Sequence, residues 1–179
     1  MDNKLLAAIH AAGHDVISYR FNRYNYKSGK HLRMYPNELC LWQPDDIFLK
    51  SLQTEDNAKE AKTQTKCYLA GMAALHVVGC DGDKVKKGAE NDIYESKNLI
   101  TTWNLDPLQN QYNQVIEILS KRQNIDALNL IASCLLSCEE IPAIIVKWMI
   151  DTVDGKVTGV EFNQNLKKSF PDLYEMLSL

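Results

Sequence analysis

The sequence predicts a mainly α-helical protein of the α+β class, in which a helical bundle carries a small N-terminal β-hairpin. Apolar residues recur at helical spacing over most of the chain after residue 54, and glycines and prolines separate these stretches. Residues 15–35 differ, because aromatic and β-favouring residues flank a Lys-Ser-Gly-Lys turn, which predicts the hairpin. A chain of 179 residues has the size of one domain, so we expect residues 1–179 to fold as a single domain.

Three helices and the hairpin are predicted in the N-terminal part. Residues 3–13 have one apolar stripe, and Gly13 is expected to end this short helix. The β-hairpin arm follows at residues 15–35, and Pro44 is expected to open the next helix. Residues 54–78 are polar in their first half and apolar nearly all round in their second half. This pattern predicts a helix that enters the core with its second half.

The C-terminal part, residues 107–179, is predicted to be a helical subregion. It follows a surface loop at residues 80–91 and a short segment at residues 92–102. Amphipathic stretches are then separated by turn signals, a pattern typical of a helical bundle, and Pro171 is expected to break the last one. The predicted helices cover residues 107–119, 125–138, 142–150 and 160–177.

Charge and cysteine content limit the class of protein. A net charge of −3 argues against a generally basic nucleic-acid-binding protein, although local basic patches remain. Five cysteines without framework spacing are typical of reduced thiols in the cytosol. The N-terminus lacks a secretory pattern, and the longest apolar run is too short to span a bilayer. We therefore expect a cytoplasmic protein without membrane contact, in the host-cell cytoplasm or virion if a phage encodes it.

The hairpin arm carries the residues that we predict to bind a partner. Its basic and aromatic residues alternate, and tyrosine and arginine are enriched at the hot spots of protein interfaces, which favours a protein partner. The same side chains can contact phosphates and stack on bases, so a nucleic acid is the alternative, and a merely solvated hairpin is the third reading. A second copy of the chain also stays open as a partner. The predicted partner-binding residues are Tyr19, Arg20, Arg23, Tyr24, Tyr26, Lys27, Lys30 and Arg33.

Cys67 and His76 raise the question of a thiol enzyme. They are nine positions apart, which on one helix separates them by about half a turn in direction and about 13 Å in rise. A nucleophile and its base must meet at about 3 Å, so these two cannot pair on one helix. We expect Cys67 to be a small buried thiol, with a histidine from elsewhere in the chain as the alternative base.

Metal-ligand spacings are present but are expected to serve packing. His10 and His14 are one helical turn apart, and so are Cys134 and Cys138, so that two such helices could form a tetrahedral zinc site. The two cysteines, however, continue an apolar stripe, which favours a place in the core. We therefore predict no metal and no cofactor.

Residues 150–162 are similar to the calcium loop of an EF-hand. Gly155 takes the place of the sharp-turn glycine, and Asp154 and Glu161 take ligand positions. Ile150 occupies the first ligand position, where the motif has aspartate, so we expect an Asp-Gly turn. Calcium binding by this loop is an alternative that the sequence leaves open.

The remaining motif searches favour a protein without catalytic function. The sequence has no glycine-rich phosphate loop, no Gly-x-Ser-x-Gly elbow and no His-Glu-x-x-His pattern. We therefore predict a non-enzymatic interaction or assembly subunit, whose helical body presents the arm to a protein partner. A nucleic-acid-binding accessory protein is the alternative, and a cysteine-dependent hydrolase using Cys67 is the third class.

Two islands of the sequence resemble an uncharacterised family of small proteins from bacteria and their phages. Members have a Cys-x-x-Gly-Ala helix, followed by a Trp-Asn-Asp segment that leads into a helix. The corresponding residues are Cys67, Trp103, Asn104, Val115 and Leu119. Two positions depart from the pattern, since the glycine falls one place later and a leucine follows Asn104. The resemblance covers about a third of the chain and implies a bacterial or phage origin, with no assigned activity.

Overall fold

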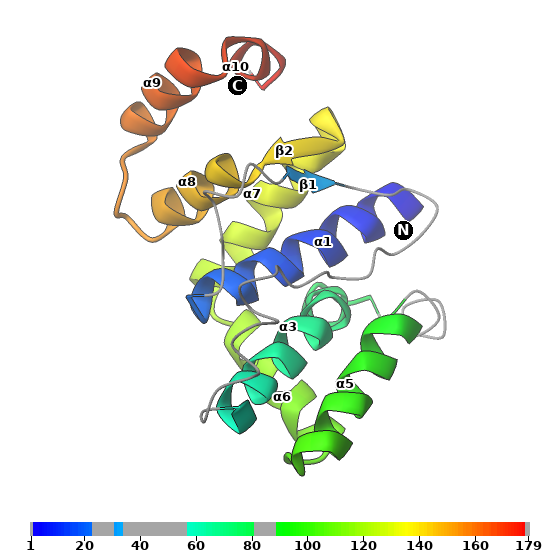
Figure 1. Ribbon diagram of the computed structural model, residues 1–179. Coiled ribbons are helices and arrows are strands. Elements are labelled where there is room, and N and C mark those ends of the chain that lie inside the picture. Colours follow the sequence, from blue (N-terminus) through cyan, green and yellow to red (C-terminus); the bar gives the residue numbers. More distant parts are fainter. Residues whose placement is uncertain (1, 23–30, 34–56, 81–88, 178–179) are drawn as a thin grey trace.

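The computed structural model describes residues 2–22, 31–33, 57–80 and 89–177, and it confirms a mainly helical protein (Figure 1). Eight helices and two short strands lie within these residues. The helices are Asn3–Arg20 (α1), Asn57–Val77 (α3), Glu90–Trp103 (α5), Leu108–Leu119 (α6), Arg122–Cys138 (α7), Ala143–Val153 (α8), Gly159–Ser169 (α9) and Pro171–Met176 (α10). The strands are His31–Arg33 (β1) and Glu140–Pro142 (β2).

Helix α1 lies in the middle of the molecule, with α3 on one side and α7 on the other (Figure 1). It is buried over most of its length, and so is the second half of α3, as the sequence pattern predicts. Helices α5 and α6 cover α3 at one end, while α9 and α10 lie at the opposite end beside α7 and α8. The core is therefore built around the pair α1 and α3.

Small residues allow α1 and α3 to approach each other closely. A Cβ atom on Gly13 would lie 2.6 Å from the backbone oxygen of Ala70 and 2.6 Å from Cβ of Ala74. The prediction that Gly13 ends the first helix is wrong, because α1 continues to Arg20. Glycine inside a helix costs about 1 kcal/mol relative to alanine, and the close contact with α3 explains its presence here.

The prediction of a β-hairpin arm is also wrong for the first residues of that arm. Residues 15–20 belong to α1, where Val16, Ile17 and Ser18 are buried in the core. Their β-favouring composition yields to tertiary packing, because Val16 and Ile17 continue the apolar face that Ile9 begins. Residues 23–30, which hold the predicted turn, lie outside the described residues.

The two strands pair with each other, although they are far apart in the sequence. β1 runs antiparallel to β2, with Leu32 opposite Ile141 and Arg33 opposite Glu140. The second strand of the predicted hairpin thus pairs with the segment between α7 and α8 rather than with residues 15–20.

The C-terminal helices agree with the sequence pattern. Helices α6, α7, α8 and α9 fall on the predicted stretches, and Phe170 separates α9 from α10 just before Pro171. Thr158 begins α9 with a capping box, in which its side chain accepts a hydrogen bond from the backbone N–H of Glu161. The Glu161 carboxylate in turn accepts from the backbone N–H of Thr158, so both groups at this helix start are satisfied.

Candidate metal centre

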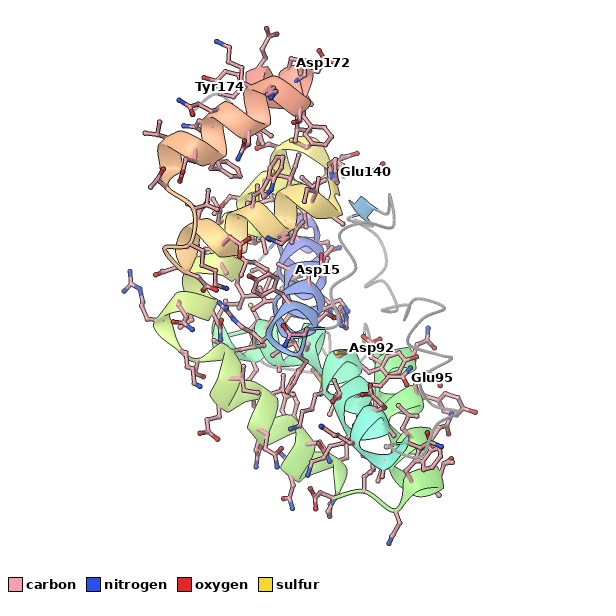
Figure 2. The ribbon with its side chains drawn as sticks, turned by 60° about the vertical axis from the view of Figure 1, so that its left-hand side comes forward. Asp15, Asp92, Glu95, Glu140, Asp172 and Tyr174 are labelled. Atoms are coloured by element: carbon pink, nitrogen blue, oxygen red, sulfur yellow. The ribbon has the colours of Figure 1, made fainter. Side chains whose placement is uncertain are left out.

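Three buried side chains from two helices meet where α1, α3 and α5 come together. His10 and His14 are one turn apart on α1, and Asp92 lies in the first turn of α5. Figure 2 shows Asp92 on the part of α5 that faces the other two helices. All three residues are almost completely buried, with exposures of 1%, 3% and 2%. Among the described residues, they form the one group of three or more side chains with the spacing of metal ligands.

The three ligand atoms form a small triangle. Nε2 of His14 lies 2.9 Å from Nε2 of His10. Oδ2 of Asp92 lies 3.2 Å from Nε2 of His10 and 3.4 Å from Nε2 of His14. The three atoms therefore lie close enough together to share one proton or one metal ion.

The backbone of α3 fixes the orientation of His14. Nδ1 of His14 lies 2.7 Å from the carbonyl oxygen of Cys67, and since a carbonyl only accepts, Nδ1 donates this hydrogen bond. Neutral His14 then carries its lone pair on Nε2, which points at the other two ligand atoms. A histidine that binds a metal is usually oriented in this way by a carbonyl or carboxylate on its second nitrogen.

Asp92 and His14 shift each other's pKa in opposite directions. Burial by itself would raise the pKa of Asp92, but the charge of His14 and the hydrogen bonds of both histidines lower this pKa to about 2. Burial would likewise lower the pKa of His14, but the charge and hydrogen bond of Asp92 outweigh it and raise this pKa. The Asp92 carboxylate is thus ionised at neutral pH and is compensated by a proton on the imidazole or by a metal cation.

The triangle has the dimensions of a metal site. An ion bound at about 2.1 Å has neighbouring ligands about 3.0 Å apart in octahedral geometry and about 3.4 Å apart in tetrahedral geometry. The observed edges of 2.9, 3.2 and 3.4 Å span this range. His10, His14 and Asp92 would be the residues that hold such an ion.

Gly71 of α3 leaves the space in which the two imidazoles lie. A Cβ atom at this position would be 2.5 Å from Nε2 of His14 and 2.5 Å from Cε1 of His10. Glycine is thus required here by the close approach of the histidines to the backbone of α3.

Sequence reasoning identified the histidine pair but missed its third partner. Asp92 follows His14 by seventy-eight positions, and no local pattern links an aspartate in a first helical turn to a histidine on another helix. Cys134 and Cys138, which we predict to pack in the core and whose spacing would also allow a zinc site, lie on α7 and contact each other. Burial, with a smaller effect from Cys138, raises the pKa of the Cys134 thiol to about 12, so this thiol stays protonated.

Cys67 is buried, as predicted, and shares α3 with His76. Its sulfur accepts a hydrogen bond from the Ser18 hydroxyl at 3.7 Å. The contact of His14 is made with the backbone carbonyl of Cys67. His76 is exposed, and its ring stacks edge-on against Tyr112 with the ring centroids 6.1 Å apart. A cysteine-dependent hydrolase remains an untested prediction.

Two of the predicted partner-binding residues bind within the chain. Arg20 donates two hydrogen bonds to the Asp154 carboxylate, at 2.5 and 2.7 Å, and a third to Asn124 at 2.7 Å. The Tyr19 hydroxyl donates to Asp151 and accepts from Lys156 at 2.9 Å. Arg33 lies in β1, and the other five residues, Arg23, Tyr24, Tyr26, Lys27 and Lys30, lie outside the described residues. Binding of a protein or a nucleic acid through the arm therefore stays a prediction.

The acidic side chains of the loop that is similar to an EF-hand already take part in contacts of this kind. Asp154 is held by Arg20, and Glu161 forms the capping box of α9. The carboxylates that a calcium ion would need thus serve the contact between α1 and α8 and the start of α9.

The Arg20–Asp154 pair leads to a prediction about acid stability. The hydrogen bonds of Arg20 outweigh burial and lower the pKa of Asp154, so the pair stabilises the fold above the unfolded-state pKa and loses this effect as the pH falls through the lower, folded-state pKa. Arg20→Ala should lower the free energy of unfolding by about 2 kcal/mol at neutral pH, and by less toward about pH 3. Urea unfolding at several pH values measures this difference.

Arg122→Ala is the matched control for this prediction. Arg122 pairs with Asp126, but its side chain is 89% exposed, so its removal should change stability by less than about 0.5 kcal/mol. A difference between wild type and Arg20→Ala that stays constant across the pH range would contradict the assignment to Asp154.

No helix within the described ranges combines the length and the apolar character that a membrane span requires. Comparison with protein-family models, with curated proteins and with solved structures finds no match to this chain. The resemblance to a bacterial and phage family therefore stays a prediction.

Proposed function

We propose that this chain is a metal-binding protein that holds one divalent transition-metal ion, with Zn²⁺ as the best fit, through His10, His14 and Asp92. One observation carries the proposal: two imidazole nitrogens and one carboxylate oxygen converge within 3.4 Å of one another in a buried site. Imidazole and carboxylate ligands suit zinc, and the orientation of His14 by the Cys67 carbonyl supports metal ligation further.

The proposed role of the metal is to hold α1 and α5 together rather than to hydrolyse a substrate. His10 and His14 have the spacing of the zinc-binding pattern His-Glu-x-x-His, in which the glutamate is the general base of a hydrolase. Ala11 stands at the position of that glutamate, and its methyl group cannot accept a proton. The site thus has the ligands of a zinc enzyme without the base that such an enzyme uses.

Metal uptake tests the proposal directly. Protein freed of metal with a chelator and then exposed to excess Zn²⁺ should retain one zinc per chain after gel filtration, as measured by elemental analysis. At a zinc concentration about a thousand times Kd, binding should stabilise the fold by about 4 kcal/mol. For a chain of 179 residues this corresponds to a rise in Tm on the order of 10 °C.

The control for this experiment is Mg²⁺, which prefers oxygen ligands and should leave Tm unchanged. A protein that retains no zinc and melts at the same temperature with and without it would refute the proposal. The triangle would then be a proton-bridged contact between imidazolium and carboxylate.

A further inference from the structure

We propose that α5 is a metal-dependent element of this fold. It packs on α1 and α3 while the ion is bound, and it detaches when the ion is lost, while the rest of the core stays folded. This inference rests on the proposed function and states what the same site would regulate. It is carried by the kind of side chain that α5 buries.

The buried side chains of α5 are polar. They are Asp92 and Ser96, which lie one turn apart on the helix. The Ser96 hydroxyl donates a hydrogen bond of 2.7 Å to the backbone carbonyl of Asp92, so this bond stays within α5. The Asp92 carboxylate instead reaches the two histidines of α1. The polar link between the buried face of α5 and α1 is therefore made by a proposed metal ligand.

Apolar packing holds α5 less firmly than the helices around it. Among the described residues, the hydrophobic core contains side chains of α1, α3, α6, α7, α8 and α9, but none of α5. The larger apolar side chains of α5 are partly buried at Ile93, Leu99, Ile100 and Trp103, and Tyr94 is exposed. Figure 1 shows α5 at the edge of the molecule. Elements with little buried apolar surface are the ones that open locally.

Loss of the ion is therefore expected to release α5 and not α1. A carboxylate that is buried without a cation is costly, and movement of α5 into water relieves this cost. Helix α1 cannot move in the same way, because it is buried over most of its length between α3 and α7.

The chain after α5 allows this movement. Helix α5 ends at Asn104, whose left-handed backbone has φ 48° and ψ 49°. Helix α6 then begins at Leu108 and is held in the core by Val115 and Leu119. A change of backbone angles around Asn104 would thus move α5 while α6 stays in place.

Thiol labelling of the whole chain with the substitution Ser96→Cys tests this inference. Serine and cysteine have nearly the same shape, and Ser96 is fully buried. Cys67 of α3 is also fully buried, with its sulfur beside Ser18 of α1, so it is the control within the same molecule. In chelator-treated protein, iodoacetamide should modify the thiol at position 96 at least ~10-fold faster than Cys67, each relative to its rate in urea. One bound zinc should slow the modification at position 96 by at least ~10-fold.

Hydrogen exchange of the wild-type chain is a second measurement that needs no substitution. An isolated helix of the length of α5, 14 residues, is barely stable in water. Without zinc, the amides of α5 should therefore exchange within about tenfold of the unprotected rate, while those of α7 stay protected. With zinc, the amides of both helices should be protected.

Two results would overturn the inference and leave the proposed function intact, because elemental analysis reports zinc binding separately. In the first, residue 96 and Cys67 are modified equally slowly without zinc, so α5 stays docked. In the second, both are modified as fast as in urea, so the whole chain unfolds without the ion. A wild-type chain that retains no zinc would instead refute the proposed function, and this inference with it.

Discussion

Replacement of Asp92 by asparagine is expected to weaken zinc binding strongly. Asparagine keeps the shape of the side chain, but it removes the negative charge that lies 3.2 Å and 3.4 Å from the two histidine nitrogens. Loss of an outer-shell partner typically lowers metal affinity by ~10- to 100-fold, and loss of a direct ligand should exceed this. Competition with a chromophoric chelator measures the change in Kd.

The matched control for Asp92→Asn is Asp126→Asn. Asp126 lies on the surface of α7 and pairs with Arg122, so its replacement should leave both Kd for zinc and Tm unchanged. Circular dichroism of the metal-free variants separates lost binding from lost folding. Equal zinc affinity in wild type and in a folded Asp92→Asn variant would exclude Asp92 as a ligand.

Replacement of Gly71 by alanine is expected to have the second large effect, on folding and metal binding together. The added Cβ atom would lie 2.5 Å from atoms of both His10 and His14, a distance at which side chains must move. Forcing a methyl group into a packed core typically costs about 1 to 3 kcal/mol, which exceeds the gain of about 1 kcal/mol from replacing glycine by alanine in a helix. Urea unfolding of the metal-free protein should show this net loss.

Gly159→Ala is the matched control, because it is the same substitution at a position where the added Cβ atom has free space. A Cβ atom at Gly159, in the first turn of α9, would meet no atom within 4 Å. Stability should therefore remain the same or rise by about 0.5 kcal/mol. If Gly71→Ala is as stable as Gly159→Ala and binds zinc equally well, the histidines do not depend on the close contact with α3.

The parts of the fold that depend on local pattern were predictable from sequence. The stripe from Leu108 to Leu119 and the break before Pro171 correspond to α6 and to the boundary between α9 and α10. The region around Gly13 was not predictable in this way, because the residues that make glycine necessary there belong to α3, more than fifty positions away. For residues 15–20, the β-favouring composition predicted a strand, but packing in the core holds these residues in α1.

The candidate site was likewise predictable only where it depends on local pattern. Helical spacing places His10 and His14 on one face because the helix continues beyond Gly13. Asp92 joins them through the tertiary arrangement of α1, α3 and α5, which a single sequence does not contain. Tyr19 and Arg20 are a further example, since their acidic partners in α8 and the loop after it turn them inward.

The separation of the ligands along the chain also bears on how long the folded protein survives. An ion held by His14 and Asp92 closes a loop of seventy-eight residues, and it can do so only after α1, α3 and α5 have assembled. Interactions that form after the folding transition state slow unfolding and leave the refolding rate almost unchanged. The half-life of the native state should therefore lengthen with zinc supply, so that metal starvation would shorten the lifetime of the protein without altering how fast it is made.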